Sequence, residues 1–229
     1  MIGDVIEGFV PNTYQIENQW EEAKTHLDLL KIPLYLVPGN HDLWNRNSYL
    51  IWRRKFGKTY YSFNYRDCHF LILNTEENFG SGQDGFGTDQ LTFIKEDISQ
   101  NHYKNQILIF MHQPVWLLSG KMKEEWDDIE SLLDGVSYHV FAGHLHILGG
   151  KKENGKRYLM VGPTGGSMRF ARNPSLGFLH HITWVTVQND DCSVCFIEPG
   201  NIYPEELALK SYQLFLKGMK LLNKNMLIQ

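Results

Sequence analysis

Four fragments along this chain carry residue types that bind divalent metals, and three of them stand directly after an apolar run. In chain order they are Gly3-Asp4, Gly39-Asn40-His41-Asp42, His112 and Gly143-His144-Leu145-His146. Short apolar runs such as residues 106–111 are typical of strands that a parallel sheet buries on both faces. Because open α/β sheets place their chemistry at the ends of such strands, the pattern predicts an α/β fold with one shared site.

The four fragments differ in how specific they are. A Gly-Asp dipeptide is common in turns, and a single histidine such as His112 could simply end a strand. Gly-Asn-His-Asp after an apolar strand is a much stronger signal, and two imidazoles two residues apart, at His144 and His146, can point at adjacent metals. Carboxylate, carboxamide and imidazole ligands together suit divalent metals such as Zn, Mn and Fe. They do not indicate a structural site built from thiolates.

The order of the fragments resembles the calcineurin-like metallophosphoesterase family, whose pattern runs Asp-x-His, Gly-Asp-x-x-Asp, Gly-Asn-His-Asp/Glu, His and Gly-His-x-His. The resemblance covers the chain from its first residue to about residue 200. The Asp-x-His segment is the element without a counterpart, since only Met1 and Ile2 precede Gly3. We therefore expect an N-terminally truncated form of a longer enzyme.

The resemblance implies a role for each motif residue. The implied metal ligands are Asp4, which bridges two metals, Asn40, His112 and His144 for the second metal, and His146 for the first. His41 matches the histidine that is not a ligand and that protonates the leaving group. Glu7 stands where the family usually has a second aspartate, which pairs with this histidine in some members. Two divalent ions (Mn, Fe or Zn) are implied for a complete chain, and here we expect one to bind more tightly because two ligands of the first metal are missing.

These ligands suit the hydrolysis of phosphate esters. Two cations neutralise the ester, lower the pKa of a bridging water and hold the hydroxide in line, while a histidine hands a proton to the departing alkoxide. We therefore predict a hydrolase that acts on phosphomonoester or phosphodiester bonds by metal-activated water, with a phosphorylated small molecule or a phosphoprotein as substrate. The alternative is a scaffold or binding module that kept the fold, lost the first metal position and has weak or no phosphatase activity.

The apolar periodicity alternates between helix and strand and then turns to strands. Helical spacing covers residues 12–30, 43–56, 88–100 and 123–133, and strand-like runs cover residues 34–37, 60–65, 69–73, 106–111, 137–142, 147–150, 157–161, 180–187 and 192–197. Thr88 is a candidate N-cap, Asn154-Gly155 is the strongest hairpin signal, and Pro204 opens a C-terminal helix over about 204–224. This order fits a single domain, residues 1–229, with the fold of the resembled family: an α/β four-layer sandwich of two packed mixed β-sheets flanked by helices.

Charge and cysteine content limit the classes of partner. The formal charge of −4 and the lack of a Lys/Arg run give no signal for nucleic acid or for an anionic membrane surface. No spanning segment or signal peptide is visible, and an odd number of cysteines favours a reducing compartment, so we predict a cytoplasmic protein. Cys192 and Cys195 lie in a strand-like run where residues three apart face opposite sides, which favours small buried residues over a metal or redox pair.

One loop in the strand-rich half of the chain carries two arginines. It runs from Gly165 to Arg172 and contains Arg169. Guanidinium groups bind phosphate with two parallel hydrogen bonds, so these arginines could contact a substrate phosphate. The other interpretation is an ordinary solvated loop.

Overall fold

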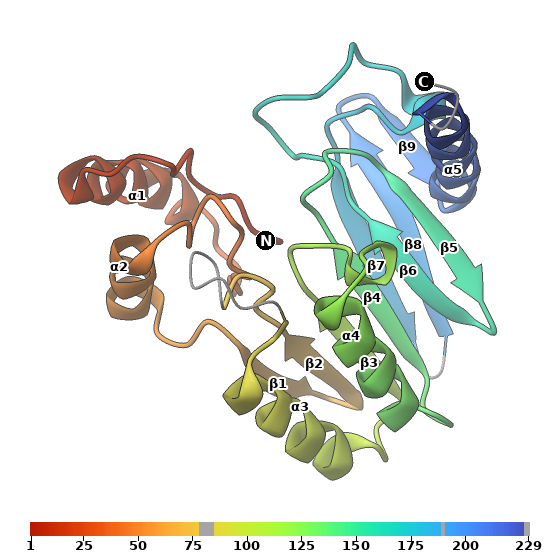
Figure 1. The fold of residues 1–229 in the computed structure, drawn as a ribbon, viewed down its shortest axis with the longest axis horizontal. Coiled ribbons are helices and arrows are strands. Elements are labelled where there is room, and N and C mark those ends of the chain that lie inside the picture. Colours follow the sequence, from red (N-terminus) through yellow and green to blue (C-terminus); the bar gives the residue numbers. More distant parts are fainter. Residues whose placement is uncertain (78–84, 189–190, 227–229) are drawn as a thin grey trace. The chain divides into compact units, whose positions relative to one another are not determined.

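The computed structural model describes residues 1–77, 85–188 and 191–226 of the chain (Figure 1). By its internal contacts the chain divides into two compact units, residues 1–138 (unit 1) and 139–229 (unit 2). Each unit contains both helices and strands, and the strands belong to two separate sheets. The predicted α/β class is therefore confirmed.

Unit 1 contains three strands, β1 (Tyr61–Tyr65), β2 (Cys68–Ile72) and β3 (Gln106–Phe110). β1 and β2 form a hairpin, whose turn contains Arg66 at a φ of 53°. β2 and β3 run parallel, which requires a crossover between them, and the helix α3 (Thr88–Asn101) provides it. β3 is almost wholly buried, as its continuous apolar run predicted.

The other helices of unit 1 are α1 (Thr13–Leu27), α2 (Arg46–Phe56), α4 (Lys121–Leu132) and the short 3₁₀ helix η1 (Val115–Leu117). Asn12 caps α1 through its side chain, and Asn45 forms a capping box with Ser48 at the start of α2. α1 and α2 pack through Trp20 and Trp52, whose ring centroids lie 5.6 Å apart. Both tryptophans are fully buried, so this contact forms the centre of one core of unit 1.

A buried polar network ties α3 to the β1–β2 hairpin. His69 on β2 places Nε2 2.6 Å from Asp97 Oδ2 on α3, and Ser62 on β1 donates to Asp97 Oδ1 at 2.5 Å. The second nitrogen of His69 lies 2.8 Å from Asn64 Oδ1. Buried polar groups need such partners, so His69, which matches no motif, has a structural role here.

Some predicted elements and end residues were wrong. Residues 34–37 are not a regular strand, because Val37 forms only an isolated parallel bridge with Ile2 and no ladder continues from it. Thr88 is the first helical residue of α3 and not its N-cap, which is Gly87. Pro204 ends a strand and does not open the last helix.

Unit 2 contains β5 (Gly149–Glu153), β6 (Lys156–Met160) and all of β4 (Tyr138–Ala142) except its first residue. β4 pairs in parallel with β6, and β5 and β6 form a hairpin through Asn154-Gly155, as predicted. Both turn residues have positive φ, 51° and 80°, which is the conformation that an Asn-Gly turn favours.

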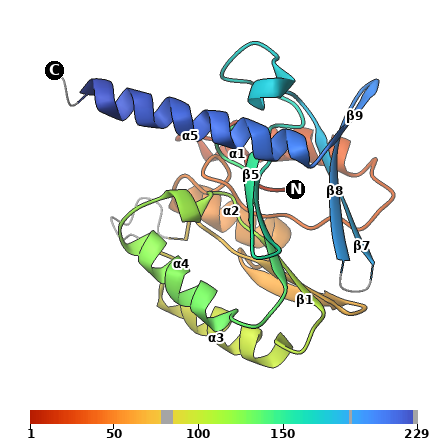
Figure 2. The same cartoon turned by 90° about the vertical axis from the view of Figure 1, so that its right-hand side faces the viewer.

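The second sheet consists of β7 (Ile182–Gln188), β8 (Asp191–Glu198) and β9 (Asn201–Pro204), all antiparallel. The 3₁₀ helix η2 (Pro174–Leu176) and the long helix α5 (Glu206–Met226) complete unit 2, and α5 packs along β5 and η2 (Figure 2). In the described part of the chain no helix is both long and apolar enough to cross a membrane.

Candidate metal centre

Two motif glycines allow two loops of unit 1 to approach each other closely. A Cβ added at Gly3, where φ is +77°, would lie 2.8 Å from the Cα of Gly39 and 2.3 Å from His112 Nδ1. A Cβ added at Gly39 would lie 2.3 Å from Asp4 Oδ1. No side chain fits in either place, so the glycines of Gly3-Asp4 and Gly39-Asn40 are required by contact between the loops.

Two predicted ligands of unit 1 converge on a nitrogen atom of a third. His112 stands two residues after the end of β3, and its Nε2 lies 3.1 Å from Asp4 Oδ2 and 3.0 Å from Asn40 Oδ1. The other ring nitrogen, Nδ1, lies 3.0 Å from the backbone carbonyl oxygen of Ile2, to which it can donate. A carbonyl at Nδ1 selects the tautomer in which the Nε2 lone pair is available to a metal. Carboxylate oxygen, amide oxygen and imidazole nitrogen thus fit a divalent cation.

The charges of Asp4 and His112 are mutually stabilising. Burial by itself raises the pKa of Asp4, but the hydrogen bond from His112 and its positive charge outweigh burial and lower this pKa below its usual range. Burial likewise lowers the pKa of His112, and the hydrogen bond and negative charge of Asp4 outweigh it and raise the value. Each of the two groups therefore favours the charged form of the other. A metal at this site would take the place of the imidazolium proton.

Asp42 holds the two loops together. Its side chain is fully buried and accepts hydrogen bonds from the backbone N–H groups of Gly39 at 2.9 Å, Val5 at 3.0 Å and Ile6 at 3.3 Å. Burial and the nearby carboxylate of Asp4 raise the pKa of Asp42 to about 7, although the backbone donors act in the opposite direction. This carboxyl therefore orients the loops and is not placed as a ligand.

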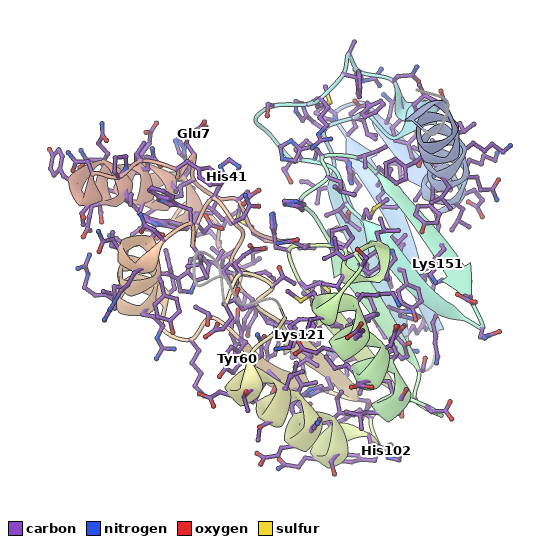
Figure 3. The ribbon with its side chains drawn as sticks, in the orientation of Figure 1. Glu7, His41, Tyr60, His102, Lys121 and Lys151 are labelled. Carbon is purple, nitrogen blue, oxygen red and sulfur yellow. The ribbon has the colours of Figure 1, made fainter. Side chains whose placement is uncertain are left out.

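His41 lies beside Glu7, as Figure 3 shows, but the contact is made by the backbone of Glu7. Its Nδ1 forms a short hydrogen bond with the carbonyl oxygen of Glu7, and its backbone N–H donates to Asp4 Oδ1 at 3.0 Å. The ring of Phe9 meets it edge-on at a centroid distance of 4.5 Å. The pairing of His41 with the Glu7 carboxylate stays a prediction.

The two remaining predicted ligands lie in unit 2, in the turn after β4. His144 and His146 both have positive φ, 68° and 54°, which is uncommon outside glycine and marks a strained turn. His146 Nδ1 lies 2.9 Å from the carbonyl oxygen of Ser167. As at His112, this contact leaves Nε2 as the ligand atom.

The family is decided by its characteristic sequence pattern. The model of the calcineurin-like phosphoesterase family matches residues 1–148. The chain belongs to this family. The resemblance to this family found in the sequence is therefore confirmed, and members of the family usually bind divalent metals.

Among relatives of this chain, the SbcD component of the nuclease SbcCD of Staphylococcus epidermidis is 26% identical over 184 residues, which is 78% of this chain and 45% of the relative. The chain thus spans less than half the length of that curated relative.

Two solved structures share the fold. GAP50, described as the anchor in the inner membrane complex of Plasmodium, has a TM-score of 0.57 at 15% identity and covers 87% of this chain and 74% of its own. The 5′-nucleotidase of Candida albicans has a TM-score of 0.53 at 14% identity, and the match covers 98% of this chain and 48% of the nucleotidase. These likenesses confirm the predicted metallophosphoesterase-like fold class.

Sequence reasoning missed a buried carboxyl next to the predicted ligands. Glu76 is 3% exposed, and its Oε1 accepts hydrogen bonds from Gln113 Nε2 at 2.8 Å and Thr75 Oγ1 at 2.9 Å. Burial raises the pKa of Glu76. Because Gln113 follows His112 directly, this contact holds the segment after β3 that carries His112. A glutamate four residues beyond a strand carries no signal that would single it out.

Proposed function

We propose that the chain is a metal-dependent phosphoester hydrolase that works by metal-activated water. The observation that carries the proposal is the convergence of Asp4 and Asn40 oxygens on His112 Nε2, with Nδ1 held by a backbone carbonyl. Ligand histidines in metal sites are oriented in this way. We propose that His144 and His146 supply the remaining nitrogen ligands.

The proposed roles follow from the atoms that each side chain presents. When bound, divalent cations would neutralise the ester and make a water molecule acidic enough to attack it. Asp4 and Asn40 present oxygens to the cations, and Asp42 keeps the two loops from separating. With Nδ1 of His41 engaged by the Glu7 carbonyl, Nε2 is the atom that gives a proton to the leaving oxygen.

The substrate class is proposed more broadly than the sequence indicated. A phosphorylated small molecule and a phosphoprotein remain candidates. The similarity to a component of a nuclease adds nucleic acid, which the net charge of −4 had not suggested. The metals proposed are Mn, Fe or Zn, two in a complete site, because these ligand types accept several ions. A single-domain organisation and a cytoplasmic location stay predictions.

The test separates metal binding from chemistry. The chain is loaded with Mn, Fe or Zn, and hydrolysis of p-nitrophenyl phosphate and bis(p-nitrophenyl) phosphate is measured with metal content. We expect His112→Ala to lose both metal and activity, and His41→Ala to keep the metal while turnover falls about 10²-fold or more. His102→Ala, an exposed histidine outside the motifs, is the control. Parallel loss of metal and activity in His41→Ala would contradict the proposed acid.

The second candidate is a binding module without catalysis. It is supported by the shared fold with GAP50, which is described as an anchor. If this candidate is right, the chain binds metal, His112→Ala abolishes this binding, and neither phosphate ester is hydrolysed with any of the three metals. Turnover that depends on His41 would exclude it.

A further inference from the structure

In unit 2 the loop of residues 165–172 is held by two histidines. The backbone carbonyl oxygen of Ser167 lies 2.9 Å from His146 Nδ1, and that of Gly166 lies 3.1 Å from His180 Nε2. One of these histidines, His146, is a proposed metal ligand. The loop is therefore ordered by a hydrogen bond to a proposed ligand. A loop that is already ordered loses little conformational entropy when it binds a ligand.

The two arginines of the loop have different surroundings. Arg172 donates to both carboxylate oxygens of Glu198, at 2.6 and 2.5 Å, and to the Tyr203 hydroxyl at 3.1 Å. It therefore anchors the far end of the loop. Arg169 is exposed, and among the described residues no hydrogen bond or ion pair engages its guanidinium. Only Arg169 is thus available to an anionic ligand.

An aromatic side chain stands next to this arginine. Phe170 is 64% exposed, and its ring contacts that of Phe178 at a centroid distance of 4.9 Å. Phe178 is itself fixed, because it pairs with Asn173 in an isolated antiparallel bridge. Phe170 therefore presents an exposed ring supported from behind, and such rings stack well on the flat face of a nucleic acid base.

We propose that Arg169 and Phe170 form a recognition site for a nucleotide unit, in which Arg169 binds phosphate oxygens and Phe170 stacks on the base. This inference rests on the proposed function, because the loop is placed by the proposed ligand His146. Two residues of chain span at most about 7 Å, so Arg169 starts within that distance of Ser167, the residue that contacts His146. Arg169 is nearer in sequence to Ser167 and would bind the phosphate, and Phe170, the next residue, would bind the base.

The experiment compares two substrates that differ only in the base. Hydrolysis and equilibrium binding of adenosine 5′-monophosphate and of ribose 5-phosphate are measured for the wild-type chain, Phe170→Leu and Arg169→Gln. Tyr103→Leu, at an aromatic residue of unit 1 that is 73% exposed, is the control. A short single strand of deoxyadenylate forms a further arm, which distinguishes a free nucleotide from a nucleotide unit within a nucleic acid.

We expect the wild-type chain to prefer the nucleotide, and Phe170→Leu to reduce this preference about tenfold, the size of one base–aromatic stack. Arg169→Gln should weaken the binding of both substrates by a similar factor. Equal use of both substrates by the wild-type chain would overturn the inference and leave the hydrolase proposal intact. Selective binding of the nucleotide without turnover would uphold the recognition site and overturn the hydrolase. Unchanged preference in Phe170→Leu would contradict the stacking role.

Discussion

Gly8→Ala tests whether the close approach of residues 2–8 to the Gly39-Asp42 loop positions His41. Gly8 has a φ of +60°, and a Cβ added there would lie 1.9 Å from the carbonyl oxygen of His41. Non-bonded atoms need more than about 3 Å, so one of the two segments must move by about 1 Å or more. The Gly8 segment is not free to yield, because the Gly8 N–H donates to Gln19 Oε1 of α1 at 2.9 Å.

The cost can be worked out from what this movement breaks. An L-residue in the left-handed region costs about 1–2 kcal/mol. A shift of this size also lengthens the hydrogen bond from His41 N to Asp4 Oδ1, now 3.0 Å, and a bond to a charged group contributes about 1.5–3 kcal/mol. Gly8→Ala should therefore lower the free energy of unfolding by about 3–5 kcal/mol. A displacement of about 1 Å at His41 should lower kcat about 10²-fold.

Gly135→Ala is the matched control in the same unit. Gly135 has a φ of +76°, and a Cβ there would meet no atom within 4 Å. This variant carries the backbone strain without the overlap, so we expect a loss of only about 1–2 kcal/mol and an unchanged kcat. Urea unfolding followed by tryptophan fluorescence and steady-state kinetics on p-nitrophenyl phosphate measure both effects. Equal unfolding midpoints and equal kcat for the two variants would refute the reasoning.

Three further predictions concern a buried histidine, the core and the metal. Burial lowers the pKa of His181 to about 4, so the unfolded chain takes up a proton more readily than the folded one. The free energy of unfolding should therefore be highest above about pH 6.5 and fall by up to about 3 kcal/mol towards pH 4. In His181→Gln the midpoint of urea unfolding should fall less over this pH range. Trp20→Ala should cost about 3–5 kcal/mol in the same assay, because Trp20 is 1% exposed against Trp52, and a loss below about 1 kcal/mol would contradict this core. A metal at about 100 times its Kd should stabilise the chain by about 2.7 kcal/mol, chelator should remove the effect, and His112→Ala should show no metal-dependent shift in thermal unfolding.

Local features could be predicted from the sequence because each depends on a few neighbouring residues. The Asn154-Gly155 hairpin has the positive φ values that these residues allow, and the helices of unit 1 formed close to their expected bounds. The apolar run at residues 106–111 became a buried strand over its first five residues, Gln106–Phe110. Residues 34–37 did not become one, because a strand also needs a partner, and pairing here stops at Ile2 and Val37.

The amino-acid sequence by itself determined which side chains carry metal-binding atoms and in what order, since ligand chemistry belongs to residue type. Only the tertiary structure decided how they are used. Asp4 and Asp42 have the same carboxyl group, yet Asp4 lies against His112 while Asp42 receives three backbone N–H donors. The carbonyls that orient His112 and His146 belong to Ile2 and Ser167. Every residue has a backbone carbonyl, so these contacts leave no trace in a sequence and arise only when distant segments fold together.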